Sequence, residues 1–296
     1  EHAAFLSVRL GVGDLPSRTR VQLPTRDLGA ASEWEQLRSL VDEHATVTGV
    51  PVVERLSDAG ALGIAAEPAV ASAIMRALLL QIASLHSPAD VALCVLAMGS
   101  AEDEWAWAKW LPHIDSPHAP VRSPLASDVP SSSRMLAELE ELIMQRRAGR
   151  SGARRVRSHL RGLTPGEVDV WEAVDADPVT PAVVVFVADA SGVDRGRLVQ
   201  LAEDGPDVGV YTVWVERHPE ALPVVCRTFV SFAYGAPTVS FVRHGSTVRL
   251  TRVEALERSR AVAAARSLAP LEDDGAPILD ESDLPSAVRL VDLFED

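Results

Sequence analysis

A nucleotide-binding protein would hold phosphate in a turn such as the one between residues 61–65 and 68–85, where a short apolar strand leads into an apolar helix. A loop of the type G-x-x-x-x-G-K-[ST] in this position would cradle phosphates with its backbone N–H groups and its lysine. The turn reads Ala65-Ala66-Glu67-Pro68, with no glycine, no lysine and no Ser or Thr to bind magnesium. The pattern therefore predicts the framework of a nucleotide site without its phosphate-binding residues.

The lysine content of the chain and the acid in this turn also argue against phosphate binding. Lys109 is the one lysine of the chain, and no glycine-rich loop precedes it. Glu67 places a carboxylate at the helix N-terminus, which the helix dipole would otherwise make favourable for a phosphate. We therefore expect Ala65, Ala66 and Glu67 to mark a degenerate nucleotide site that holds no cofactor. The helix is then a packing element capped by its own acid.

Asp189 is the second residue with the position of a nucleotide ligand. It follows the apolar run 181–188, which is typical of a strand whose final aspartate holds magnesium. The next residue is Ala190, so the acidic residue that would orient a water is missing. We expect Asp189 either to bind a metal ion or to cap a helix over 194–202.

Three of the six tryptophans, Trp105, Trp107 and Trp110, lie close together. They could form a stacking platform that binds a base or a peptide partner. Trp107, Trp110 and Leu111 share one helical face, and Lys109 is the single basic residue among them, which favours a hydrophobic plug. The loop after them carries His113, Asp115 and His118, which we do not expect to hold a metal because prolines make the loop irregular.

Seven arginines lie between residues 146 and 161, directly after a helix expected over 131–147. Gly and Ser interrupt this segment and its helical periodicity is lost, which favours a flexible, solvated insertion. The alternative is a loop that presents arginines such as Arg150 and Arg154 to a ligand phosphate or a partner. In that alternative the domain keeps ATP and magnesium, with Asp189 on the metal and an arginine in place of the lysine.

The elements that must position these residues are typical of an α/β domain. Four apolar segments have the length and composition of strands buried on both faces, and helical segments separate them. Residues 5–23 read as an N-terminal antiparallel hairpin with its turn near Gly13, and residues 226–250 as an antiparallel meander. We expect a three-layer fold related to the P-loop NTPases, with a mainly parallel central sheet and antiparallel additions at both ends. The central strands are 61–65, 91–98, 183–188 and 209–215.

The composition narrows the function classes. The net charge of −14 over 296 residues argues against a nucleic-acid or anionic-membrane surface. Cys94 and Cys226 lie inside apolar strands and are expected to be buried free thiols of a reducing compartment. We identify no apolar run of the 18 or more residues that a membrane span needs. Because the chain begins at Glu1, we expect it to be a fragment whose membrane anchor lies elsewhere.

Several stretches together resemble EccC, the FtsK/SpoIIIE-like ATPase of the type VII (ESX) secretion system. The resemblance is to the membrane-proximal, ATPase-like domain that precedes the family's ATPase domains, and it covers essentially the whole chain. The stretches that carry it are 5–11 (FLSVRLG), 62–65 (LGIA), 76–88 (RALLLQIASLHSP), 107–113 (WAKWLPH) and 284–294 (LPSAVRLVDLF).

The resemblance implies a structural or coupling role at the cytoplasmic face of the plasma membrane. The implied partners are the other domains of the secretion motor and the membrane channel components, with oligomers formed only in the full complex. Residues 1–268 would be the degenerate ATPase-like domain and 269–296 a linker toward the next ATPase domain. A DNA-contacting translocase module is a further alternative, which rests on the arginine segment and the kinship with FtsK.

Overall fold

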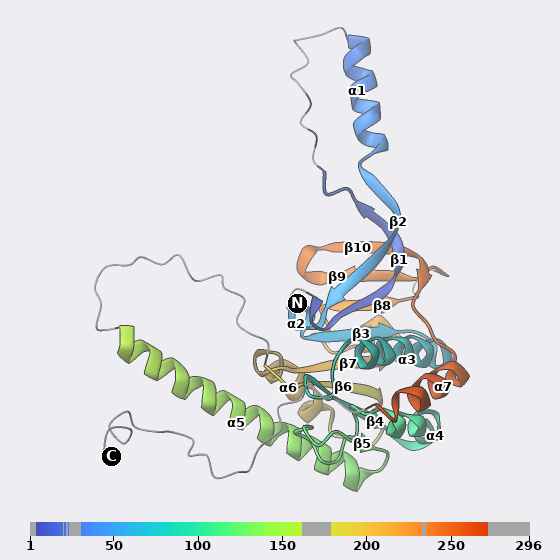
Figure 1. Ribbon diagram of the computed structural model, residues 1–296. Coiled ribbons are helices and arrows are strands. Elements are labelled where there is room, and N and C mark those ends of the chain that lie inside the picture. The colour runs from blue at the N-terminus through green and yellow to red at the C-terminus, as the bar shows by residue number, and fades with distance from the viewer. Residues whose placement is uncertain are drawn as a thin grey trace.

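The computed structural model describes residues 4–19, 21, 23, 31–161, 179–232 and 235–271, with side chains except at 100 and 150–161. One ten-stranded sheet, in the order β2-β1-β10-β9-β8-β3-β7-β6-β4-β5, forms its centre (Figure 1). The strands are β1 Ser7–Pro16, β2 Thr46–Arg55, β3 Ala61–Ala65, β4 Val91–Ala97, β5 Leu125–Ala126, β6 Ala182–Asp189, β7 Val210–Glu216, β8 Thr228–Ser231, β9 Thr238–Phe241 and β10 Ser246–Val253.

Helices cover both faces of the parallel half of this sheet, so the domain has three layers (Figure 1). The helices α3 and α7 lie on one face, and α5 and α6 lie on the other. The helices are α1 Ala31–Glu43, α2 Leu56–Ala59, α3 Pro68–Leu85, α4 Glu102–Trp105, α5 Val129–Arg161, α6 Arg195–Asp204 and α7 Arg258–Leu268.

The parallel half confirms the expected central strands. β3, β7, β6 and β4 pair in that order, all parallel, with β8 and β5 added in parallel at the two sides. Successive residues of β6 alternate between the two cores: Val184 and Phe186 pack under α3, whereas Val185 packs toward α5 and α6. A strand covered on both faces needs apolar residues at every position, which explains why its sequence is continuously apolar.

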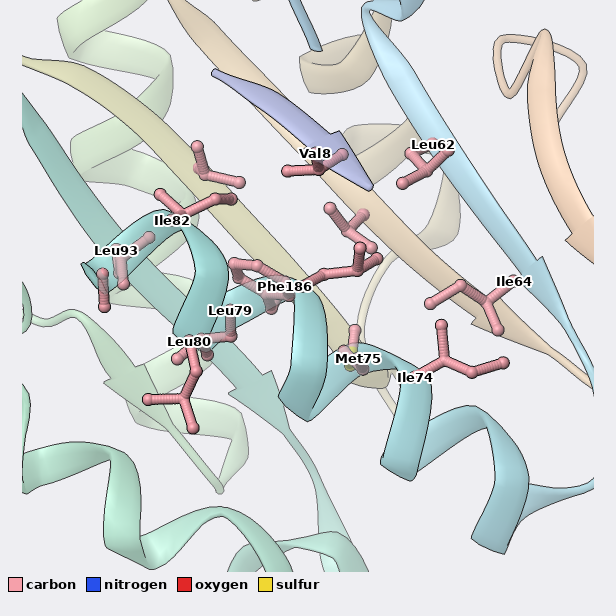
Figure 2. Close-up of a cluster of buried hydrophobic side chains, with 14 of the residues drawn as sticks. Val8, Leu62, Ile64, Ile74, Met75, Leu79, Leu80, Ile82, Leu93 and Phe186 are labelled. Atoms are coloured by element: carbon pink, nitrogen blue, oxygen red, sulfur yellow. The ribbon is translucent and has the colours of Figure 1, made fainter. Parts of the chain in front are cut away.

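The largest core lies between α3 and the sheet. Figure 2 shows Ile74, Met75, Leu79 and Ile82 of α3 directed at side chains of the strands, with Phe186 at the centre of the group. Ten residues of α3 are buried, and these include a single charged residue, Arg76. The 18 residues of α3 do reach the length and hydropathy of a membrane span, contrary to our expectation, and their packing in this core accounts for that composition.

The antiparallel half joins strands from both ends of the chain at one edge of the sheet. β8, β9 and β10 form the expected meander. The expected N-terminal hairpin is wrong: β1 continues through Gly13, with register shifts beside it, and pairs with β2 on one side and β10 on the other. Gly13 permits a close approach instead of a turn, because a Cβ there would lie 2.7 Å from the carbonyl oxygen of Arg249.

The arginine segment is also different from the favoured prediction. α5 continues to Arg161, so the backbone of residues 146–161 is helical and the flexible loop is wrong. Arg146, the first arginine of the segment, fixes α5 to the rest of the domain. It donates hydrogen bonds to the carbonyl oxygens of Pro181, at 2.6 Å, and Val208, at 2.8 Å. Burial lowers the pKa of this guanidinium. The side chains of Arg150 and Arg154 lie outside the described residues.

Two other sequence expectations concern buried thiols and the linker. Cys94 and Cys226 are buried and free, as expected, and burial raises the pKa of each thiol to about 12. Both are therefore protonated and unreactive at neutral pH.

The proposed linker, 269–296, lies outside the described residues after Leu271, so its boundary stays a prediction.

Close packing between β3 and its neighbours gives a stability prediction. A Cβ added to Gly63 would lie 2.7 Å from Cδ1 of Leu222 and 2.9 Å from Cβ of Phe229, so Gly63→Ala should cost about 1–3 kcal/mol of unfolding free energy. Gly149→Ala is the matched control, because nothing lies within 4 Å of that helical position. It should stabilise by about 0.5–1 kcal/mol. Urea unfolding of both variants measures the difference, and equal effects would contradict the packing described.

Candidate functional site

A cleft of about 800 Å³ opens where β3, β6 and β7 end at their carboxyl ends. Ligands of open parallel sheets bind at this edge, because the loops that follow the strands converge there. Its lining includes Ala66, Pro68 and Asp189, so the structure brings the two expected halves of a nucleotide site together. Ala65 is different: it is the buried last residue of β3 and does not line the cleft.

The turn before α3 offers few donors to a phosphate. The N–H group of Ala66 donates to the carbonyl oxygen of Glu216 at 3.0 Å, and Pro68 at the first helical position has no N–H group. The Glu67 side chain makes no capping hydrogen bond, so our expectation of a helix capped by its own acid is wrong. Its carboxylate is 73% exposed and pairs with Arg217 at 3.5 Å.

Asp189 is held by its own loop. Its Oδ1 accepts hydrogen bonds from the backbone N–H of Ser191 at 2.8 Å and from the Ser191 hydroxyl at 2.6 Å. It does not cap α6, because Asp194 does so by accepting from the N–H groups of Gly196 and Arg197. Among the described residues no group of three His, Cys, Asp or Glu side chains could hold a metal.

Two arginines that the sequence analysis did not select lie in this cleft beside the ends of β6 and β7. Arg195, at the start of α6, pairs with Glu216 at 2.7 Å and donates to the carbonyl oxygen of Ala221. Its guanidinium also lies 5.8 Å from the centre of the Trp214 ring. Arg217 follows β7 and forms the pair with Glu67. Arg195 is therefore held by partners of the domain itself, whereas Arg217 is paired through an exposed contact.

The third arginine, Arg76, projects from the middle of α3 and is 6% exposed. It pairs with Glu104 and donates from Nε to the carbonyl oxygen of Leu256 at 2.9 Å. Burial lowers its pKa, and the carboxylate of Glu104 opposes that shift. Arg258 of α7 approaches the same carboxylate at 3.8 Å. The pair therefore ties together α3, α4 and the segment that leads into α7.

The charges of the cleft cancel in pairs. Each arginine has a carboxylate partner, and Asp189 adds one negative charge that no arginine meets among the ion pairs of the described residues. A phosphate chain would have to break a pair to gain a cation, and it would still meet the released carboxylate. Among the described residues the cleft is thus a formed cavity in which each arginine is paired. Glu67 does not line it and meets Arg217 from outside. The charged residues that line the cleft are Arg76, Arg195, Arg217, Glu104, Asp189 and Glu216.

The tryptophan cluster divides into two parts. Trp105 and Trp107 are 2% and 4% exposed and lie in the core with Leu111, so Trp107 and Leu111 pack as the expected plug. Trp105 also borders the cleft. Trp110 is 43% exposed and remains available to a partner. His113 is buried, with its Nε2 2.9 Å from the carbonyl oxygen of His86, and serves as a structural link.

The cleft arginines were missed because nothing in their spacing sets them apart. Arg76 interrupts an apolar stripe, and Arg195 and Arg217 directly follow the acids Asp194 and Glu216. The one usable signal is positional: residues just after the carboxyl ends of parallel strands meet at one edge. Applied to 216–217 and 194–195, that rule would have placed both arginines beside Asp189.

Comparison with known proteins shows homology to the EccC proteins of ESX secretion systems. The chain is 35% identical over 147 residues to an ESX secretion system protein EccC of Thermomonospora curvata, covering 48% of this chain and 11% of that protein. It is 25% identical over 236 residues to the EccC of Geobacillus thermodenitrificans, covering 78% of this chain and 14% of that protein. The chain thus spans about a tenth of the length of these curated relatives. No protein-family model matches it.

Solved structures support the fold alone. The domain aligns with EssC (ATPases 2 and 3) of Geobacillus thermodenitrificans at a TM-score of 0.55 and 12% identity, covering 89% of this chain and 49% of that one. It aligns with Thermomonospora curvata EccC (ATPases 2 and 3), a structure with a signal sequence peptide, at 0.53 and 16% identity, covering 90% and 48%. The α/β fold related to P-loop ATPases is therefore confirmed.

The buried pair of Arg76 and Glu104 gives a testable energy. Glu104→Ala leaves the buried guanidinium without its carboxylate and should cost about 2–3 kcal/mol of unfolding free energy. Glu67→Ala is the matched control, because its pair with Arg217 is exposed and should change stability by less than about 0.5 kcal/mol. Chemical denaturation measures both. If the two substitutions cost the same, Arg76 does not depend on Glu104.

Proposed function

We propose that this chain is a non-hydrolysing, ATPase-like domain of an EccC-type ESX secretion protein, which couples ATPase domains to a membrane channel during protein export. The observation that carries the proposal is the pairing of every cleft arginine with a carboxylate of the same domain. A functional phosphate site needs free cations and free backbone N–H groups at a helix N-terminus. Here the cations are paired and the Ala66 N–H group is used by the sheet.

The coupling part of the proposal is supported by the shape of the domain. Figure 1 shows α1 at the top, at the end of the long β1–β2 pair and away from the three layers, and the far half of α5 extending to the left. No residue of α1 is buried, although Trp34 and Leu37 give it an apolar side. Projections of this kind suit contacts with neighbouring domains and channel components. The domain would act at the cytoplasmic face of the plasma membrane, with the anchor in another part of the protein.

The two alternatives fit the structure less well. An ATP-hydrolysing domain would use Asp189 to hold magnesium, and Oδ1 of this carboxylate already accepts two hydrogen bonds from Ser191. It would also need Arg150 or Arg154 at the phosphates, and the side chains of these two α5 residues lie outside the described part of the structure. A DNA-contacting module is opposed by the net charge of −14.

Isothermal calorimetry with MgATP tests the proposal. The chain should show no saturable heat at millimolar nucleotide, because phosphate binding must break ion pairs of the cleft. Asp189→Ala serves as the comparison and should behave identically. Saturable binding in the micromolar range that Asp189→Ala abolishes would show a working magnesium–nucleotide site and overturn the non-hydrolysing assignment.

A further inference from the structure

A second hollow lies near the opposite end of α3, and the proposed function does not use it. This groove of about 660 Å³ is formed by the loop after residues 106–110 and by the chain that leaves α7. Trp110, Pro112, Pro117 and Leu271 are among its lining residues. It therefore contains the exposed part of the W-x-K-W-L-P-H string, whose other aromatic residue, Trp107, is buried in the core.

The walls of the groove are fixed by hydrogen bonds to the main chain. His113 contacts the carbonyl oxygen of His86 at 2.9 Å, and Ser116 donates to the carbonyl oxygen of Pro88 at 3.3 Å. Leu111, the residue after Trp110, is 1% exposed. The groove is thus held in shape before anything binds, which lowers the entropy cost of binding a chain segment.

Two cations lie beside the ring of Trp110. The Lys109 ammonium is 5.5 Å from the centre of its ring, and the Arg266 guanidinium is 6.0 Å from it on the α7 side. Neither cation forms an ion pair within the part of the chain that the structure describes, and both side chains are exposed. Asp115 is the one carboxylate among the residues that line the groove. An exposed aromatic ring with two cations beside it fits an acidic segment that carries apolar side chains.

The sequence supplies such a segment at this place. Ala269 and Leu271 already line the groove, and Leu271 is the last described residue before 272–283, EDDGAPILDESD. This stretch contains six acids, no basic residue and the apolar pair Ile278-Leu279. Its start is tethered at the groove, so binding would occur at high effective concentration without loss of translational freedom.

We propose that residues 272–283 bind in this groove, with their acids at Lys109 and Arg266 and their apolar pair against Trp110. The contact sets the direction in which the chain leaves the domain, so that whatever follows residue 283 is held in a defined position relative to α7. This inference does not depend on the nucleotide chemistry of the cleft. It assigns a role to Lys109, Trp110 and Arg266 that the core and the cleft do not explain.

The test uses the full 296-residue chain and a charge exchange. One variant carries Lys109→Glu with Arg266→Glu, a second carries Glu272→Lys, Asp273→Lys and Asp274→Lys, and a third combines all five. Hydrogen exchange of residues 272–283 is measured by mass spectrometry. Each reversal alone should speed exchange by about tenfold, and the combination should restore most of the protection, since opposite charges are paired again.

Arg260→Glu is the matched control, because it reverses an exposed arginine of the same helix, α7, away from the Trp110 ring, and should leave exchange unchanged. Urea midpoints of all variants report any loss of folding, and the variant in 272–274 keeps the test open if the groove variant is unstable. Equal exchange in wild type and both reversals would overturn the proposal. Protection that rises with protein concentration would overturn it too, because a second copy would then be the occupant.

Discussion

The structure depends on the burial of α3 against the parallel strands. This apolar helix fixes both ends of the domain: its N-terminus borders the cleft at the carboxyl ends of β3, β6 and β7, and its C-terminus, through His86 and Pro88, supports the groove around Trp110. Its one buried charge, Arg76, is satisfied by Glu104 and by a main-chain oxygen of the segment before α7. The packing of α3 therefore also sets the geometry of the cleft and of the groove around Trp110.

The cleft has the strand, turn and helix that frame a nucleotide site, and we propose that it does not bind phosphate. The strand, turn and helix remain because they carry the core, which needs only apolar residues of suitable volume. Under the proposed function, internal ion pairs stand where phosphate contacts would be, among them Arg195 with Glu216 and Arg217 with Glu67. Among the described residues each cleft arginine thus already has a carboxylate partner.

The central strands and α3 could be predicted from sequence because strands and helices buried on both sides need unbroken apolar runs, as in β4 and β6. The predicted hairpin at Gly13 was wrong because glycine also occurs where two strands approach closely, and not only in turns. The loop predicted after residue 147 was wrong because Gly149 and Gly152 obscured the continuation of α5, which Arg146 holds against the sheet. The ion pairs of the cleft join residues far apart in the chain, such as Arg217 and Glu67, and local patterns do not encode them.

The central claim is that the cleft arginines are committed to carboxylates of the domain and not to a ligand. The most direct measurement is NMR of the side-chain Nε–H groups of Arg76, Arg195 and Arg217, recorded without and with MgATP. The account predicts that the resonances of these paired side chains do not shift on addition of millimolar MgATP. Saturable shifts of the Arg195 and Arg217 resonances would show that phosphate displaces the glutamates, and would contradict it.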